Sequence, residues 1–352
     1  MNEAELKTEK QRLIIFILIA YGISYLMGIL MYFGKKSGIG LNAFPAAQMM
    51  YPACGVIIGL FVTNKGRKKL PTGFFWTVIV TTAIIFLIAL ISFFAPPYDI
   101  EIPGQAASIS VYYLLSRYPL ILGSIIAFIL ALVEGREKRL NAGLVRNNWG
   151  MTVWMVALFI IIYFLRTIIS IMLSIATGSA DTGAFYEWLG IFKMSMTWIS
   201  IAVLPINYFF VFIAFFGEEY GWRYYLQPLL QRKFGMRSGV LLLGIAWGLW
   251  HLPIDLFYYS DDTGLQMLCT QIITCMAYGI FFGYAYLKTN NIWATVCIHY
   301  LNNNLIPVIS GNYSADVLEH QAISWSDIPL HLLSMFIFII FIFAKEYRRS
   351  EG

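Results

Sequence analysis

Apolar runs of about 20 residues recur along the chain, and their length constrains the fold more than any other feature of the sequence. A helix of about 20 residues spans the hydrocarbon core of a bilayer. Charged residues make up only 12% of the 352 residues, whereas a soluble domain carries about 25%. The sequence therefore predicts an all-α, multi-pass helical membrane protein.

We expect about ten transmembrane spans, and both termini then lie on one side of the membrane. The expected spans cover residues 13–33, 49–62, 74–94, 119–133, 152–176, 198–219, 240–258, 267–287, 292–309 and 328–343. Clusters of Lys and Arg at 65–69, 136–146 and 223–237 fall in loops on the side of the termini. By the positive-inside rule, both termini are cytoplasmic.

Nothing in the sequence separates a soluble domain from the spans, so residues 1–352 are expected to form a single integral membrane domain. The net charge of +5 comes from the loops beside the spans, and no basic surface for nucleic acid is visible. The cysteines lie in or beside apolar segments without a CxxC pair, which predicts free thiols.

Two carboxylates, Glu218 and Glu219, follow directly on the apolar run 199–216. Acidic residues inside a membrane cost about 2.5–3.5 kcal/mol each, so their presence indicates function. On a helix, Glu219 and Arg223 share a face and can form an ion pair, while Glu218 points elsewhere and can serve as a base. The alternative is that the helix ends near Phe216 and the charges mark the membrane interface.

A histidine, His251, lies inside the seventh expected span, with Trp247 one turn earlier on the same face. Asp255, one turn later, is a candidate to orient the imidazole ring. The structural alternative is a histidine that only forms a hydrogen bond between helices.

His299 and Asn303 are four residues apart in the ninth expected span and therefore face the same place. Imidazole and carboxamide groups are suitable donors to a developing oxyanion. Only the spacing from His299 favours Asn303 over its neighbours Asn302 and Asn304. The alternatives are a polar contact between helices and the lining of a permeation path.

Together, these polar residues favour the interpretation that the protein is a hydrolase. A carboxylate and an imidazole can activate water, and His and Asn donors can stabilise the tetrahedral intermediate of amide hydrolysis. The sequence contains no HExxH motif, which excludes a zincin site, and no GxSxG motif, which weakens a serine hydrolase interpretation.

The three motifs, Glu-Glu-x-x-x-Arg at 218–223, aromatic-x-x-x-His at 247–251 and His-x-x-x-Asn at 299–303, resemble those of the CPBP intramembrane proteases. This family includes the type II CAAX prenyl endopeptidases and bacteriocin-processing or self-immunity proteins. The resemblance covers about residues 200–305, which would form the protease-like core. Trp247 stands where the family usually has Phe.

The resemblance implies an intramembrane endopeptidase that cuts a membrane-associated substrate of the prenylated or leader-peptide type. Glu218 and His251 would activate the attacking water, and His299 and Asn303 would form the oxyanion hole. The implied surroundings are membrane lipid, a peptide or protein substrate and a bacterial cell membrane.

The resemblance also implies that Glu219, held by Arg223, is a supporting carboxylate. Members of the family have been described both as metalloproteases and as glutamate-dependent enzymes without metal. In the first case Glu218, His251 and His299 would bind Zn²⁺ and leave an open position. In the second case no cofactor is needed.

Two other classes of function remain open. One is a non-proteolytic bacteriocin-immunity or scaffold membrane protein. The other is a transporter, in which buried Glu, His and Arg would relay ions or protons, although no inverted repeat is visible. Arg166, in the middle of the fifth expected span, needs a partner. We expect a structural ion pair there, and the alternative is contact with the C-terminus of a substrate.

Overall fold

The computed structural model describes residues 2–64, 66, 68–96, 98–101, 109–314 and 317–348, and these are almost entirely helical. The chain divides into two compact units, Met1–Val145 with Phe209–Tyr225, and Arg146–Tyr208 with Leu226–Gly352. The single membrane domain 1–352 and its core at 200–305 stay predictions. Lys65, Arg67 and Arg349, which contribute to the predicted charge bias, lie outside the described residues.

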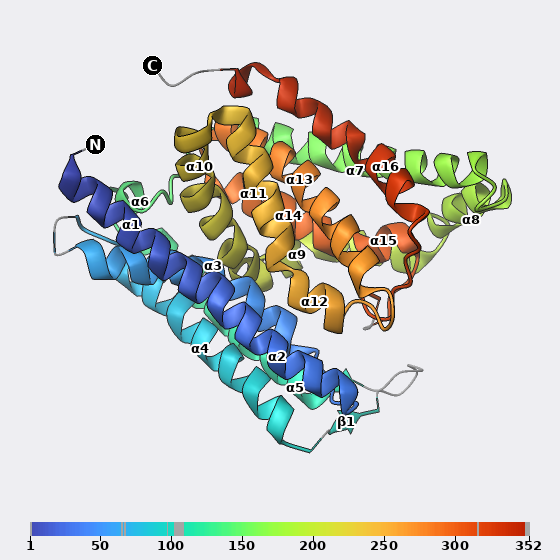
Figure 1. Cartoon of the computed structure of the whole chain (residues 1–352), viewed down its shortest axis with the longest axis horizontal. Coiled ribbons are helices and arrows are strands. Elements are labelled where there is room, and N and C mark those ends of the chain that lie inside the picture. Colours follow the sequence, from blue (N-terminus) through green and yellow to red (C-terminus); the bar gives the residue numbers. More distant parts are fainter. Residues whose placement is uncertain are drawn as a thin grey trace. The chain divides into compact units, whose positions relative to one another are not determined.

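The first unit contains mostly long helices (Figure 1). Its elements are α1 (Glu3–Ile17), the π-helix η1 (Leu18–Ile23), α2 (Ser24–Lys36), α3 (Ala43–Asn64), α4 (Thr72–Phe94), β1 (Asp99–Ile100), β2 (Ile109–Ser110), α5 (Val111–Val133) and α6 (Arg136–Asn141). The strands β1 and β2 form a short antiparallel pair. The end of α9 (Ser195–Glu219) and most of the π-helix η2 (Tyr220–Leu226) also belong to this unit.

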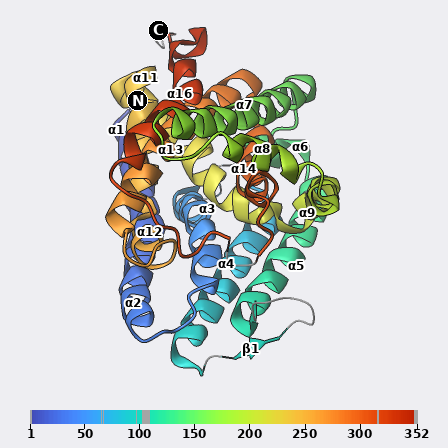
Figure 2. The same ribbon diagram turned by 90° about the vertical axis from the view of Figure 1, so that its right-hand side faces the viewer.

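The second unit contains the beginning of α9 and most of the remaining helices. They are α7 (Trp149–Ala176), α8 (Gly183–Ile191), α10 (Gln227–Phe234), α11 (Met236–Trp250), α12 (Leu252–Phe257), α13 (Gly264–Thr289), α14 (Ile292–Asn304), α15 (Ile306–Ser310), α16 (Asp327–Ile339) and the 3₁₀ helices η3 (Ile340–Phe343) and η4 (Lys345–Tyr347). Figure 2 shows α7 and α16 side by side, and both also contact α13.

Eight helical stretches of the described chain are long and apolar enough to cross a membrane, which confirms the all-α, multi-pass membrane fold. They are Glu3–Lys36, Ala43–Asn64, Thr72–Phe94, Val111–Val133, Trp149–Ala176, Ser195–Phe234, Met236–Phe257 and Gly264–Thr289. The expected span 292–309 is interrupted at Leu305, between α14 and α15. The expected span 328–343 corresponds to a shorter apolar helix, Asp327–Phe343. The number of crossings and the side of the termini stay predictions.

Glycines allow very close helix contacts in the first unit. A Cβ atom added at Gly217, near the end of α9, would lie 2.4 Å from the backbone oxygen of Met49 in α3. A Cβ at Gly221, one turn later in η2, would lie 2.3 Å from the Cβ of Pro52. Such small-xxx-small pairs let helix backbones approach in a membrane. The two glycines therefore hold the segment with Glu218 directly against α3.

The second unit repeats this arrangement between α11 and α13. A Cβ atom added at Gly244 would lie 2.5 Å from the Cα of Met276, and one at Gly248 would lie 2.7 Å from the Cα of Ile272. These glycines flank Trp247, and His251 follows three residues after the second. In both units, a glycine pair lies beside the predicted site residues.

We predict that Gly217→Ala destabilises the protein, because its methyl group would clash with the backbone of α3 rather than with a movable side chain. Overpacking of this kind costs about 1–3 kcal/mol. Thermal unfolding in detergent micelles would measure the effect. Gly150→Ala is the matched control, since nothing lies within 4 Å of a Cβ at this helical glycine. Equal melting temperatures for the two variants would contradict the proposed close packing.

Candidate active site

The helix that carries Glu218 and Glu219 does not end near Phe216. It is continuous over Ser195–Phe234, so the interpretation of these charges as the end of a helix is wrong. The α-helical part ends at Glu219, and the π-helix η2 follows directly. π-Helical turns are rare and often occur at functional sites.

The two carboxylates have different partners, as the helical spacing predicted. The Arg223 Nε lies 3.1 Å from the Glu219 Oε2, and both side chains are fully buried. Glu218, which is 2% exposed, accepts a hydrogen bond of 3.4 Å at Oε2 from the Trp222 Nε1. Phe16 packs edge-on against Trp222 and restrains its ring. Glu218 is thus oriented by an indole, and Glu219 by a guanidinium group.

Stacked aromatic rings hold the same segment on another side. The ring centroids of Phe216 and Tyr220 are 4.8 Å apart, and those of Tyr220 and Tyr224 are 4.5 Å apart. The Tyr220 hydroxyl donates a hydrogen bond of 2.9 Å to the backbone oxygen of Ala142. These contacts fix the rotation of the segment about its axis, and hence the directions of the two carboxylates.

His251 lies at a break between α11 and α12, and this break explains its orientation. Its backbone N–H bonds the Gly248 oxygen at 3.0 Å, in a turn tighter than an α-helix. The oxygen of Trp247, which an α-helix would use for that N–H, instead lies 2.9 Å from the His251 Nδ1. A carbonyl only accepts, so Nδ1 carries the hydrogen and Nε2 presents a lone pair. Within the described part of the second unit, no residue forms a hydrogen bond with the His251 Nε2.

Asp255 does not orient His251, so this expectation is wrong. Neither carboxylate oxygen of Asp255 bonds the imidazole, although the side chain is fully buried. Its backbone N–H instead donates to the His251 oxygen at 2.9 Å. The orienting group is the main-chain oxygen of Trp247.

The structure brings His251 and His299 to the same indole ring. The centroid of Trp247 is 6.0 Å from that of His251 and 5.5 Å from that of His299. Both histidines are buried, with exposed fractions of 8% and 3%. Phe282 covers His299 at a centroid distance of 5.8 Å. The second and third sequence motifs therefore come together in the second unit.

Asn303 is half-buried, and a neighbour fixes its carboxamide. The Asn302 Nδ2 donates a hydrogen bond of 2.8 Å to the Asn303 Oδ1, which directs the NH₂ group of Asn303 away from Asn302. The Asn304 carboxamide has another partner, because its Nδ2 donates a hydrogen bond of 2.9 Å to the backbone oxygen of Tyr300. The choice of Asn303 among the three asparagines stays a prediction.

Several features that position the candidate site residues were not identified from the sequence. The glycine pairs beside Glu218 and Trp247 form visible GxxxG patterns and could have been recognised. The π-helix and the role of the Trp247 oxygen have no simple sequence signal, because both depend on which backbone hydrogen bonds form. The orienting role of Asn302 likewise depends on the side-chain rotamers.

Within each unit, the described residues include no group of three or more His, Cys, Asp and Glu side chains arranged to hold a metal ion. His251 nevertheless fits a metal ligand, because its Nε2 lone pair is presented and its Nδ1–H is held by a carbonyl. The second unit thus offers imidazole nitrogens as candidate ligands.

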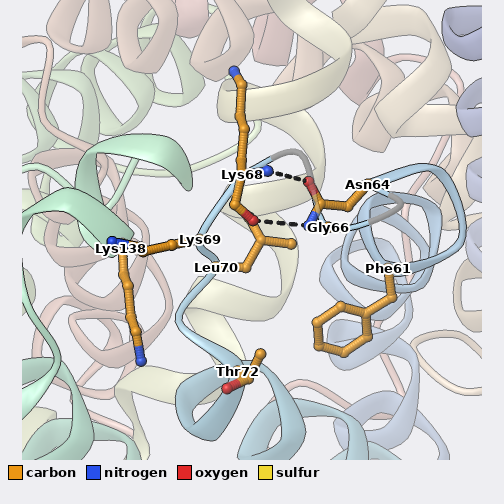
Figure 3. Close-up of a pocket in the computed structure, with 8 residues that line it drawn as sticks. All are labelled: Phe61, Asn64, Gly66, Lys68, Lys69, Leu70, Thr72 and Lys138. Atoms are coloured by element: carbon orange, nitrogen blue, oxygen red, sulfur yellow. Dashed lines mark hydrogen bonds between the residues drawn. The ribbon is translucent and has the colours of Figure 1, made fainter.

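A separate pocket of about 450 Å³ lies in the first unit, beside the loop between α3 and α4 (Figure 3). It is lined by Phe61, Asn64, Gly66, Lys68, Lys69, Leu70, Thr72 and Lys138. The Asn64 carboxamide closes the loop through hydrogen bonds with the backbone of Lys68, drawn as dashed lines in Figure 3. The described residues that line the pocket include no carboxylate or imidazole, so they give no support for a hydrolytic site there.

We predict that Arg223→Met destabilises the protein by about 3–5 kcal/mol, because it leaves the buried Glu219 without its cation. The double variant Glu219→Leu/Arg223→Met should recover most of this loss, since apolar residues can replace a buried ion pair. Unfolding in detergent would measure both. A double variant as unstable as the single one would show that the charge pair is not the source of the effect.

Comparison with known proteins agrees with the three motifs. Residues 198–305 match a family model described as type II CAAX prenyl endopeptidase Rce1-like. The chain is also similar to the CAAX prenyl protease 2 of Methanococcus maripaludis, with 23% identity over 211 residues, which cover 56% of this chain and 73% of the relative. No solved structure matches the chain. The family match and the archaeal relative together support the predicted CPBP family for this membrane protein, through the segment 198–305 that carries Glu218, His251 and His299.

Proposed function

We propose that the protein is an intramembrane endopeptidase of the CAAX type, which hydrolyses a peptide bond of a membrane-associated substrate. The observation that carries this proposal is the pair of buried histidines on Trp247, with the His251 Nδ1 bonded to a carbonyl and Nε2 presented as a base. A neutral imidazole in this tautomer can accept a proton from water. The family match points to the same chemistry.

Glu218 and His251 are proposed to activate the attacking water. Glu218 is buried on a segment fixed by aromatic stacking and by close packing on α3, and such rigidity keeps a general base in place. Glu219 would support it from the adjacent position. Its negative charge is compensated by Arg223.

His299 and Asn303 are proposed to form the oxyanion hole. They lie one turn apart on α14, and the Asn303 amide donors are directed by Asn302. Donors fixed before the reaction stabilise the negative charge on the tetrahedral intermediate without reorganisation. After the C–N bond breaks, the proton taken from water would pass to the leaving amine, which balances the hydrolysis.

Metal dependence is a second question about the same site. Glu218, His251 and His299 are the residues that would hold a zinc ion, which supplies Lewis-acid activation of water when it is bound. The substrate is proposed to be a prenylated or leader-type peptide, and the membrane a bacterial cell membrane, as the CPBP family implies.

The first experiment is cleavage of prenylated and unmodified peptides by purified protein. We predict that Glu218→Gln lowers kcat by about 10²–10⁴-fold, the usual contribution of a general base. Glu187→Gln is the matched control, because it removes an exposed carboxylate from α8 and should leave cleavage unchanged. Each protein is assayed with and without a zinc chelator.

The outcomes separate the alternatives. Cleavage that needs Glu218 and survives chelation supports the glutamate-dependent mechanism, while loss on chelation and recovery with zinc supports the metalloprotease. A Glu218→Gln protein that still cleaves at the wild-type rate contradicts the proposal. A biological activity that survives this substitution would support the non-proteolytic immunity or scaffold function.

A second variant tests the oxyanion hole. We predict that Asn302→Ala lowers kcat about tenfold with little change in KM, because it releases the Asn303 carboxamide without removing it. Steady-state kinetics would separate the two constants. A change in KM alone would instead place Asn302 and Asn303 in substrate binding.

A further inference from the structure

Arg166 lies deep in α7, about 15 Å from the carboxyl end of this helix at a rise of about 1.5 Å per residue. Its Nη2 is 3.4 Å from the Nδ1 of His331 in α16. The Nε2 of His331 is in turn 2.8 Å from the Oγ1 of Thr274 in α13. Three neighbouring helices of the second unit thus contribute one polar cluster, which we call the Arg166 cluster.

The Arg166 cluster carries an uncompensated positive charge. A guanidinium group only donates, so the His331 Nδ1 accepts, Nε2 carries the hydrogen, and the ring is neutral. Among the residues that the structure describes, no carboxylate forms an ion pair with Arg166, and its buried Nε has no hydrogen-bond partner. Asp327, one turn before His331, instead accepts from the Ser324 backbone at 2.8 Å. The expected structural ion pair is therefore wrong for the described chain.

The cluster lies next to the catalytic histidines through α13. Thr274 contacts His331, and the following residue, Cys275, has its Sγ 3.8 Å from the His251 Nδ1. One turn later, Tyr278 lies within Coulombic range of Arg166 and stacks on Phe282 at a centroid distance of 5.5 Å.

Phe282 is the ring that covers His299, at a centroid distance of 5.8 Å. The same stretch of α13 therefore contacts His331 of the Arg166 cluster as well as the two histidines. The cation belongs to the surroundings of the proposed active site, although it is separate from the proposed catalytic residues.

We propose that the Arg166 cluster binds the C-terminal carboxylate of the peptide substrate and thereby selects peptides cleaved near a free C-terminus. This inference rests on the proposed function and adds a specificity-determining residue to it. A guanidinium group matches a carboxylate through two parallel hydrogen bonds. The unused Nε of Arg166 and its neutral neighbour His331 leave this capacity unfilled.

The depth of Arg166 favours a substrate over a lipid. A lipid phosphate stays at the headgroup level, whereas Arg166 lies about 15 Å from the nearer end of α7 and beside the helix that contacts His251. A peptide held at His251 and His299 would bring its own C-terminus to this depth. Binding would also compensate the charge of an arginine inside the membrane, which is otherwise unfavourable.

The test compares two forms of the enzyme on two peptide substrates. Peptides that differ only in a free or an amidated C-terminus are cleaved by wild-type protein and by Arg166→Gln. We expect wild type to prefer the free acid by about 10–100-fold in kcat/KM, the range for a lost charge-assisted hydrogen bond. Arg166→Gln should remove this preference by lowering cleavage of the acid toward that of the amide. Arg166→Lys should restore part of the preference.

Arg117→Gln is the control for charge, because it removes an exposed arginine from α5 and should keep the preference. Equal cleavage of acid and amide by wild type overturns the inference but leaves the protease intact. If Arg166→Gln loses kcat/KM equally on the acid and the amide peptide, the inference is likewise overturned and the protease activity still stands.

Direct binding separates this inference from the proposed function. Fluorescent acid and amide peptides are titrated onto Glu218→Gln protein, with and without Arg166→Gln. Tighter binding of the acid that depends on Arg166 supports the inference even if no cleavage is found. Equal binding of both peptides overturns it. Competition by vesicles containing phosphatidylglycerol, equal for both peptides, would assign the cluster to lipid and also overturn it.

Discussion

An ion pair between Glu219 and Arg223 lies inside a long, largely apolar helix, and both of its side chains are fully buried. Burying two charges is favourable only when their geometry is good and other contacts exclude water. Gly217 and Gly221 meet this condition by bringing the helix backbone against α3. With Glu219 neutralised, the adjacent Glu218 can be held at the same depth by the indole of Trp222.

In the second unit, a backbone carbonyl rather than a charged side chain positions the buried polar residue His251. Gly244 and Gly248 bring α11 against α13, and the helix then tightens at His251. This tight turn releases the Trp247 carbonyl from the helix, and the carbonyl then fixes the imidazole tautomer. A histidine held by a main-chain oxygen is positioned without a second buried charge, which suits a membrane interior.

Helical spacing predicted the parts of the site that depend on one helix alone. The i, i+4 rule gave the Glu219–Arg223 pair and the contact between Trp247 and His251, and both are present. The rule failed for Asp255, because a break in the helix changed which backbone oxygen was available. The limits of the helices also differ, as α3 begins at Ala43 rather than near residue 49, since an apolar pattern alone does not mark where hydrogen bonding starts.

Two arginines inside the helices, Arg223 fully buried and Arg166 half-buried, show how a structural cation differs from one that is proposed to bind a ligand. Arg223 lies 3.1 Å from a carboxylate with no exposed surface, so its charge is already compensated within the first unit. Among the described residues, Arg166 forms a polar contact with a neutral imidazole, and its buried Nε–H has no hydrogen-bond partner. A membrane protein gains little from such an arrangement unless an anion completes it. In our proposal, the C-terminal carboxylate of a peptide substrate supplies that anion. After cleavage the C-terminal fragment keeps this carboxylate, and the shortened product, whose new C-terminus lies elsewhere, loses the contact.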